Sequence, residues 1–106
     1  MIVKSRTEFG LNEDTLEKIR EVFSSFPEVE KVLIYGSRAK GNFKAGSDID
    51  LTLKGEKLTH NILSRINIKL DDLLLPYIID TSLFDSIDNK DLLDHISRVG
   101  KVFFKK

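Results

Sequence analysis

The sequence predicts an α/β (α+β) fold in which a small mixed sheet packs against helices, and we expect residues 1–106 to form a single domain. Short strand-type runs alternate along the chain with longer amphipathic helical patterns, as in layered folds of strands and helices. A length of 106 residues suffices for one hydrophobic core but not for a catalytic domain and a separate substrate domain. Substrate recognition is therefore expected to involve another chain.

The first helix is expected to begin at Asn12. The preceding residues 1–10 have no clear pattern, and we expect a loose lead-in. Asn12 is a favourable N-cap, acidic residues follow it, and Pro27 indicates a stop near the other end. The apolar residues expected to face the core recur at helical spacing: Leu16, Ile19, Phe23 and Phe26.

A glycine-rich loop joins the first two expected strands. Residues 31–35, KVLIY, form a β-branched and aromatic run, and the second strand extends from Asp48 to about Lys54. The loop between them contains three glycines and three basic residues and begins with Gly36 and Ser37. A glycine lets backbone amides approach a ligand closely, and a serine hydroxyl can donate to a phosphate oxygen.

Two carboxylates close this loop. Side chains alternate along a strand, so Asp48 and Asp50 point to one face while the apolar residues beside them point to the core. Paired like charges perturb one another's ionisation unless a cation lies between them. Mg²⁺ is commonly bound by one or two carboxylates together with substrate phosphates. The arrangement is typical of a metal-dependent phosphate site.

The second half of the chain continues the alternation. A helix capped by Thr59 and closed by Pro76 is expected before a third strand over residues 77–83. The last helix is expected over residues 89–99, with a glycine as its stop. The tail, residues 101–106, either adds a short strand or packs against a helix, and its two phenylalanines either seal the core or form a partner-binding patch.

Asp80 lies inside the apolar third strand. A carboxylate there is costly unless it is paired, exposed at an edge or bound to a metal. Asp85 is a competing acidic residue, but it follows the strand in a polar stretch typical of a turn.

The loop and its carboxylates resemble the signature of a known family. Gly36 and Ser37, ten further residues, and then the pair Asp48 and Asp50 are similar to the motif of the polymerase beta-type nucleotidyltransferases. More narrowly, the chain resembles the minimal nucleotidyltransferases (MNT), small stand-alone prokaryotic proteins that often act as the antitoxin beside a HEPN-type helical toxin. The resemblance implies a single polymerase beta-like nucleotidyltransferase domain.

The resemblance also implies roles for these residues. Gly36 and Ser37 would hold the nucleotide triphosphate. Asp48 and Asp50 would bind two Mg²⁺ ions, and Asp80 would be the third catalytic carboxylate and metal ligand. By the same resemblance, we expect AMP transfer from ATP to a hydroxyl, that of a tyrosine, on a HEPN-type toxin.

Two other functions are left open. The chain could be a non-catalytic antitoxin that acts by complex formation, or the catalytic subunit of a two-subunit nucleotidyltransferase that modifies a small molecule. Toxin neutralisation that survives loss of Asp48 and Asp50 would favour the first, and transfer to a small hydroxyl compound with the partner unmodified would favour the second.

The remaining loop and helix residues are less informative. Arg38, Lys40 and Lys44 surround the expected triphosphate, and we assign Arg38 and Lys40 to nucleotide binding, although a solvated loop explains each of them singly. Phe43 is expected to pack locally, with base stacking or a partner contact as alternatives. The two histidines, His60 and His95, are expected on polar helix faces at the surface, without a catalytic role.

Composition excludes several classes of protein. Lysine and arginine number 17, as do aspartate and glutamate, and a net charge of zero does not suggest a general nucleic-acid binder. The absence of cysteine excludes disulfides and thiolate metal sites. We find no secretory signal and no apolar run of membrane-spanning length, and expect a cytoplasmic protein.

Overall fold

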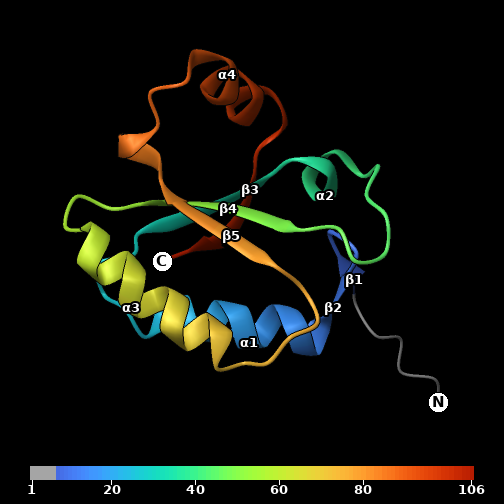
Figure 1. Cartoon of the computed structure of the whole chain (residues 1–106), viewed down its shortest axis with the longest axis horizontal. Helices are drawn as coiled ribbons and strands as arrows, with labels where there is room; N and C mark the ends of the chain where they lie inside the picture. Colours follow the sequence, from blue (N-terminus) through green and yellow to red (C-terminus); the bar gives the residue numbers. More distant parts are fainter. Residues whose placement is uncertain (1–6) are drawn as a thin grey trace.

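The computed structural model describes residues 7–106, and its centre is a four-stranded mixed sheet in the order β5-β4-β3-β6 (Figure 1). β3 (Lys31–Tyr35) pairs antiparallel with β4 (Ile49–Lys54) and with β6 (Lys101–Lys105), whereas β4 pairs parallel with β5 (Ile79–Leu83). Strands and helices pack in layers, so the predicted α+β fold class is confirmed.

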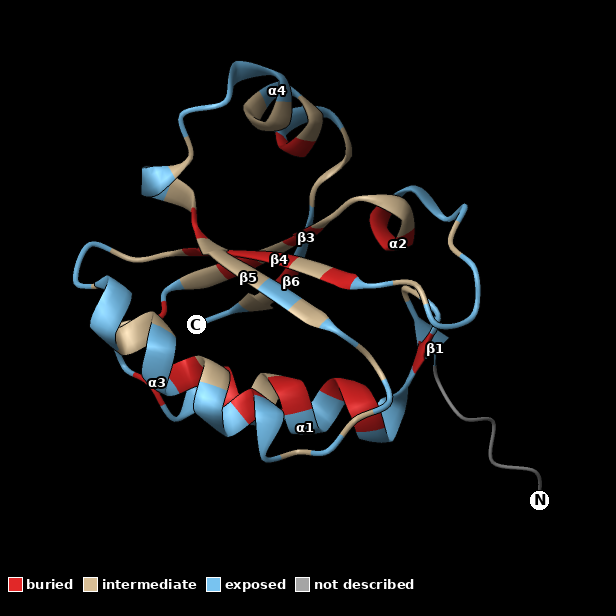
Figure 2. Cartoon of the chain, in the orientation of Figure 1, coloured by how far each residue is buried: buried red, intermediate tan, exposed pale blue. Residues whose placement is uncertain are grey.

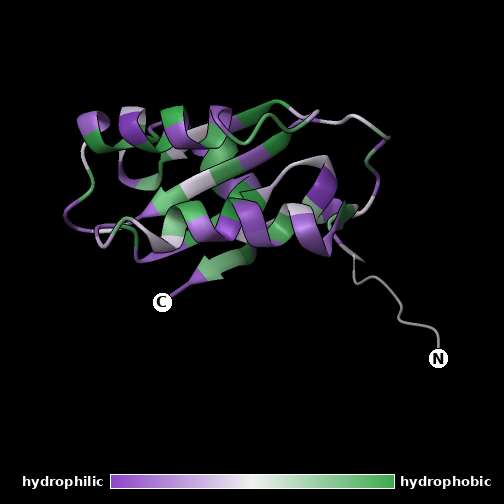
Figure 3. Cartoon of the chain, turned by 90° about the horizontal axis from the view of Figure 1, so that it is seen from below, coloured by the Kyte–Doolittle hydropathy of each residue, from purple (hydrophilic) through white to green (hydrophobic). Residues whose placement is uncertain are grey.

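One face of the sheet is covered by α1 (Glu13–Ser24) and α3 (His60–Asp71). α3 also provides the crossover connection that the parallel β4–β5 pair requires. Seen from below, α1 and α3 lie side by side, with hydrophilic and hydrophobic residues alternating along each helix (Figure 3). The core between these layers is formed by fully buried side chains from both strands and helices, among them Ile19, Phe23, Val32, Ile34, Ile49, Leu51 and Ile66.

Three helices begin at side-chain caps, two of which, Asn12 and Thr59, the sequence predicted. The Asn12 side chain accepts a hydrogen bond from Thr15 N at 2.8 Å, and Thr59 accepts one from Ile62 N at 3.2 Å. Asn89 caps α4 (Lys90–Val99) in the same way, because its side chain accepts a hydrogen bond from Leu92 N at 3.1 Å. Each cap satisfies a backbone donor that lacks a partner within its helix, which explains why the starts were predictable.

The opposite face of the sheet lies under α4, which contacts β3 (Figures 1 and 2). Most of α4 is only partly buried, and Ile96 is its one buried residue. This face presents polar side chains, so it differs in character from the apolar face against α1 and α3.

The region before α1 differs from our expectation. Residues 1–6 of the expected loose lead-in lie outside the described residues. The expectation is wrong for residues 7–10, because β1 (Thr7–Glu8) pairs with β2 (Leu11–Asn12) in a hairpin. Phe9 and Gly10 form its two-residue turn, with φ of +57° and +74°, as the turns of tight hairpins require.

Several other boundaries are shifted. β4 begins at Ile49, one residue after Asp48, and β5 begins at Ile79 rather than at residue 77. α3 ends at Asp71, and Leu74 beyond it has a left-handed φ of +55°, which is incompatible with a continued helix. Two short helices within expected loops or turns are α2 (Ser37–Lys40) and the 3₁₀ helix η1 (Phe84–Ser86).

The C-terminal tail forms a strand, β6, and Phe103 within it is buried at 2% exposure. The Phe103 ring meets the Phe23 ring edge-on with 6.3 Å between centroids, and the Phe104 ring lies tilted against Phe23 at 6.0 Å. Of the two alternatives for this tail, the core-sealing one is therefore observed. Within residues 7–106, none of the helices is both long and apolar enough to cross a membrane.

Candidate active site

The candidate site is built on the polar face of the sheet by residues that lie directly opposite one another. Asp50 of β4 is the register partner of Tyr35 on β3 and of Asp80 on β5. Directly opposed residues point to the same face of a sheet, so these three side chains share one face. Asp48 precedes β4 by one residue and is exposed, as is Asp80.

Gly36 fits closely against Asp50. Its φ of 76° and ψ of −156° belong to a region that only glycine adopts readily, and there the chain turns from β3 into α2. A Cβ atom added to Gly36 would lie 2.5 Å from Oδ2 of Asp50. The glycine is therefore needed both for its backbone conformation and for the close approach of the carboxylate.

The carboxylates interact electrostatically. Burial raises the pKa of Asp50, and the negative charges of Asp80 and Asp48 raise it further. Burial likewise raises the pKa of Tyr35; the nearby Ser82 hydroxyl lowers it, and Asp50 and Asp80 raise it. The buried Ser82 Oγ nevertheless has no hydrogen bond of good geometry. The site is thus an uncompensated negative cluster, which favours binding of a cation.

The acidic side chains are not already arranged around one ion. Within residues 7–106, no group of three histidine, cysteine, aspartate or glutamate side chains is close enough to form a ready-made metal site. The three aspartates supply the oxygen ligands that Mg²⁺ prefers, and two of them, Asp48 and Asp80, are exposed. Binding of a metal would therefore require their side chains to converge on it.

Arg38 connects the two ends of the glycine-rich loop. It is 3% exposed, and its Nε and Nη2 donate to the carbonyl oxygen of Ser47 at 3.0 and 2.8 Å. Its Nη1 donates to the carbonyl of Phe9 at 2.9 Å, and the guanidinium lies over the rings of Phe43 and Tyr77. Since Ser47 immediately precedes Asp48, Arg38 fixes the backbone from which that carboxylate projects. The guanidinium could reach a phosphate only by exchanging these bonds.

We expect Arg38→Ala to lower the free energy of unfolding by about 3 kcal/mol, because it leaves two backbone carbonyls without their charged donor. Arg38→Lys should recover only part of this loss, since an ammonium cannot reproduce the planar fork. Urea denaturation measures the effect. Lys40→Ala, in the same helix but exposed, is the control and should change stability by no more than about 0.5 kcal/mol. Equal effects of the two alanine variants would contradict the role of Arg38 in connecting the two ends of the loop.

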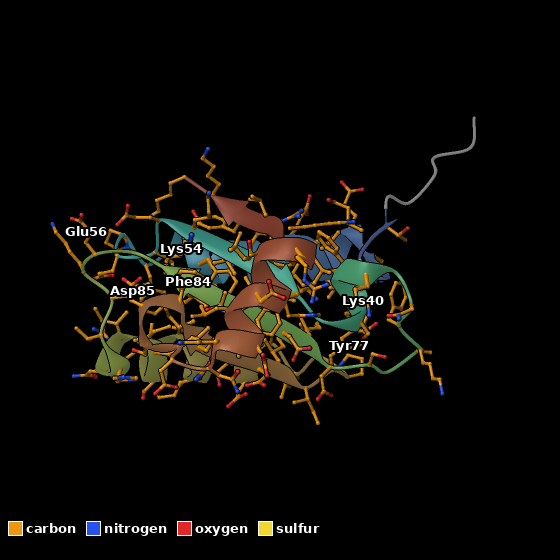
Figure 4. The ribbon with its side chains drawn as sticks, turned by 90° about the horizontal axis from the view of Figure 1, so that it is seen from above. Lys40, Lys54, Glu56, Tyr77, Phe84 and Asp85 are labelled. Carbon is orange, nitrogen blue, oxygen red and sulfur yellow. The ribbon has the colours of Figure 1, made fainter. Side chains whose placement is uncertain are left out.

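The two lysines of the glycine-rich loop, Lys40 and Lys44, are exposed. Phe43 packs locally: the Arg38 guanidinium lies 5.2 Å from its ring centroid. Asp85 lies beside Phe84 and Lys54, at the end of the sheet away from Lys40 (Figure 4). That position separates Asp85 from the carboxylate cluster and leaves Asp80 as the acidic residue of β5 at the site.

The prediction that both histidines lie on polar surface faces is wrong for His95. His60 is exposed at the start of α3, as expected. His95 is half-buried, its Nε2 accepts a hydrogen bond from Gly36 N at 3.1 Å, and its ring meets that of Tyr35 edge-on. The helical spacing of the sequence indicates this position, because residue 95 lies three positions after Leu92 and four before Val99 and so shares a helix face with them.

A family model described as "Polymerase beta, Nucleotidyltransferase" matches residues 17–106, from within α1 to the end of the chain. The chain belongs to this family. It is a nucleotidyltransferase, as the motif predicted, and the matched residues include the whole candidate site.

One curated relative of this nucleotidyltransferase is a protein of Methanocaldococcus jannaschii that is provisionally named a protein adenylyltransferase. It is 32% identical over 74 residues, a match that covers 58% of this chain and 75% of the relative.

Solved structures share the fold. A toxin–antitoxin complex with AMP-PNP aligns with a TM-score of 0.66 at 22% identity, over 91% of this chain and 75% of that chain. A tri-AMPylated Shewanella oneidensis HEPN toxin in complex with its MNT antitoxin aligns with a TM-score of 0.64 at 18% identity, over 89% and 72% of the two chains. A provisionally assigned nucleotidyltransferase of Sulfolobus solfataricus aligns with a TM-score of 0.55 at 26% identity, over 86% and 77%. The first two likenesses, at low identity, concern the fold alone.

Proposed function

We propose that this nucleotidyltransferase transfers AMP from ATP to a hydroxyl group, that of a tyrosine, on a HEPN-type partner, as the antitoxin of the pair. The observation that carries the proposal is the direct pairing of Asp50 with Asp80 across parallel strands, beside Gly36. The name of the archaeal relative supports AMP transfer to a protein, and the neighbouring MNT–HEPN complex supports the kind of partner.

The donor set fits Mg²⁺, because burial and then the clustered carboxylates raise the pKa of Asp50, and a cation would remove the repulsion between the carboxylates. Asp48 and Asp50 would hold two ions and Asp80 would share one of them, and the ions would supply charge stabilisation at the attacking and leaving oxygens.

The protein's own residues would orient the substrates. Gly36 and Ser37 would hold the β and γ phosphates at the turn into α2, with the exposed Lys40 available for their charge. Arg38 would contribute indirectly, by fixing Ser47 and hence Asp48. Asp80, nearest the sheet edge, would accept the proton of the attacking hydroxyl.

The reaction that follows is an in-line displacement. The acceptor oxygen forms a bond to the α phosphorus, the bond from that phosphorus to the β-bridging oxygen breaks, and pyrophosphate leaves. The product is a phosphodiester of AMP with the acceptor hydroxyl.

The test is the intact mass of a co-purified partner, encoded beside this chain, after incubation with ATP and Mg²⁺. We expect the partner to gain whole AMP units, and we expect Asp48→Asn to abolish the gain. Asp85→Asn is the matched control, because that aspartate lies away from the cluster. Full activity of the Asp48 variant would overturn the assignment of this site.

The same experiment separates the two alternatives. An unchanged mass in a stable complex, with neutralisation that survives loss of Asp48, would support masking of the toxin. An unchanged partner together with AMP transfer to a small hydroxyl compound would support a two-subunit enzyme.

A further inference from the structure

His95 links the last helix to the glycine turn of the site. Its Nε2 accepts a hydrogen bond from Gly36 N at 3.1 Å, across 59 positions of sequence. The imidazole also meets the Tyr35 ring edge-on, at 6.2 Å between centroids and an interplanar angle of 80°. Seen from above, α4 crosses the sheet on this side (Figure 4). His95 thus contacts two consecutive residues at the end of β3.

The hydrogen bond to His95 satisfies the N–H of Gly36, a donor that the strand pairing and helix α2 leave without a partner. Tyr35 is the last residue of β3 to pair with β4, and Gly36 is the N-cap residue of α2. The Gly36 N–H therefore lies beyond the strand ladder and before the first turn of the helix. An unpaired donor in this half-buried position would be unfavourable, and its peptide could rotate.

The orientation of that peptide matters because it sets the direction of Ser37. Gly36 has a backbone conformation that only glycine adopts readily, and glycine alone does little to hold one conformation. A hydrogen bond from a side chain on another element supplies the missing restraint. The same turn brings Gly36 against the Asp50 carboxylate.

We propose that His95 is a positioning residue, which holds the Gly36–Ser37 turn in the conformation that receives the nucleotide phosphates. The proposal rests on the proposed function, in that this turn is the phosphate site. It adds α4 to the nucleotide-binding machinery, although α4 supplies none of the carboxylates.

The proposal requires a particular state of the ring. The nitrogen that accepts cannot carry the proton, so neutral His95 must be protonated on Nδ1. The exposed His60 has no such constraint. Nitrogen-15 NMR of the imidazoles in the nucleotide-free protein should therefore show the Nδ1–H tautomer for His95, together with slow exchange of the Gly36 amide.

The variants separate the hydrogen bond from packing. His95→Phe keeps an aromatic ring against Tyr35 but removes the acceptor, whereas His95→Gln restores an acceptor oxygen. We expect the phenylalanine variant to bind a non-hydrolysable ATP analogue with Mg²⁺ about 10-fold more weakly than wild type, and the glutamine variant to recover most of the loss. His60→Phe is the matched control and should bind as wild type does.

Titration calorimetry on the full chain distinguishes the outcomes. Weaker binding by His95→Phe, rescue by His95→Gln and the Nδ1–H tautomer together support the proposal. Equal binding by wild type and His95→Phe overturns it while leaving the proposed function intact. A melting temperature lowered equally in both His95 variants, without rescue of binding, assigns His95 to packing and also overturns it. A wild-type protein that binds no analogue removes the proposed function and this inference with it.

Discussion

Replacing Asp50 with asparagine is expected to lower AMP transfer by about 10³-fold or more while raising the melting temperature of the metal-free protein. The loss of transfer follows because asparagine is neutral and would weaken the proposed metal site, which would supply the charge stabilisation. The gain in stability follows because Asp50 is part of a repulsive cluster with Asp80 and Asp48. A residue retained only for folding would not produce these opposite effects.

The direction of the stability change comes from the raised pKa of Asp50, caused first by burial and then by the neighbouring carboxylates. The folded state holds the Asp50 proton more tightly than the unfolded chain, whose aspartates titrate near pH 3.9. Stability therefore falls as the pH rises from about 3.9 through the raised pKa of the folded state, and the full cost is present above that pKa.

The measurement is calorimetric melting at neutral pH with a chelator, beside the transfer assay. Because Asp50 is partly exposed, we expect a modest rise in Tm of about 2–4 °C. Asp85→Asn is the control for both readouts. A variant that transfers AMP normally, or that melts well below wild type, would contradict this account of Asp50.

Gly36→Ala is expected to reduce transfer about 100-fold and to lower the free energy of unfolding by about 2–4 kcal/mol. The added methyl would meet Asp50 Oδ2 at 2.5 Å, and the backbone at φ 76° and ψ −156° is unfavourable for alanine. Either the carboxylate moves or the turn does, and both changes separate the proposed metal ligand from the proposed phosphate site. Steady-state kinetics and urea denaturation measure the two effects.

Gly41→Ala is the matched control for this substitution. Gly41 also has a positive φ, 87°, but a Cβ there would meet nothing within 4 Å. We expect it to cost about 1 kcal/mol of stability and to leave transfer nearly unchanged. If the two alanine variants lose activity equally, the close approach to Asp50 is not what Gly36 provides.

Much of the fold could be predicted because its determinants are local. Asn12, Thr59 and Asn89 cap helices by chemistry that extends over three residues. The strand alternation that placed Asp50 opposite the core is equally local. The pairing of Asp50 with Asp80 is not, since it depends on the register of two strands separated by α3.

The features that sequence missed depend on distant partners or on very short elements. The hairpin at Phe9 and Gly10 has two-residue strands, too short for any periodicity. Arg38 was assigned to phosphate because it is a cation in a loop, whereas its observed acceptors are backbone carbonyls, which no side-chain pattern reveals. The polarity of His95 predicts a surface position, although its spacing from Leu92 and Val99 puts it on the partly buried face of α4.

The position of β5 at the edge of the sheet has a consequence for how the enzyme loses activity. Asp80 is held at the site by the pairing of β5 with β4 alone, and on its other side β5 has no strand neighbour among residues 7–106. Edge segments open at lower free energy than the strands between them. Fraying of β5, or a one-residue slip that turns Asp80 toward the helices, would therefore remove the proposed third carboxylate while Gly36, Asp50 and the core stay in place. Inactivation by mild denaturant should then precede global unfolding.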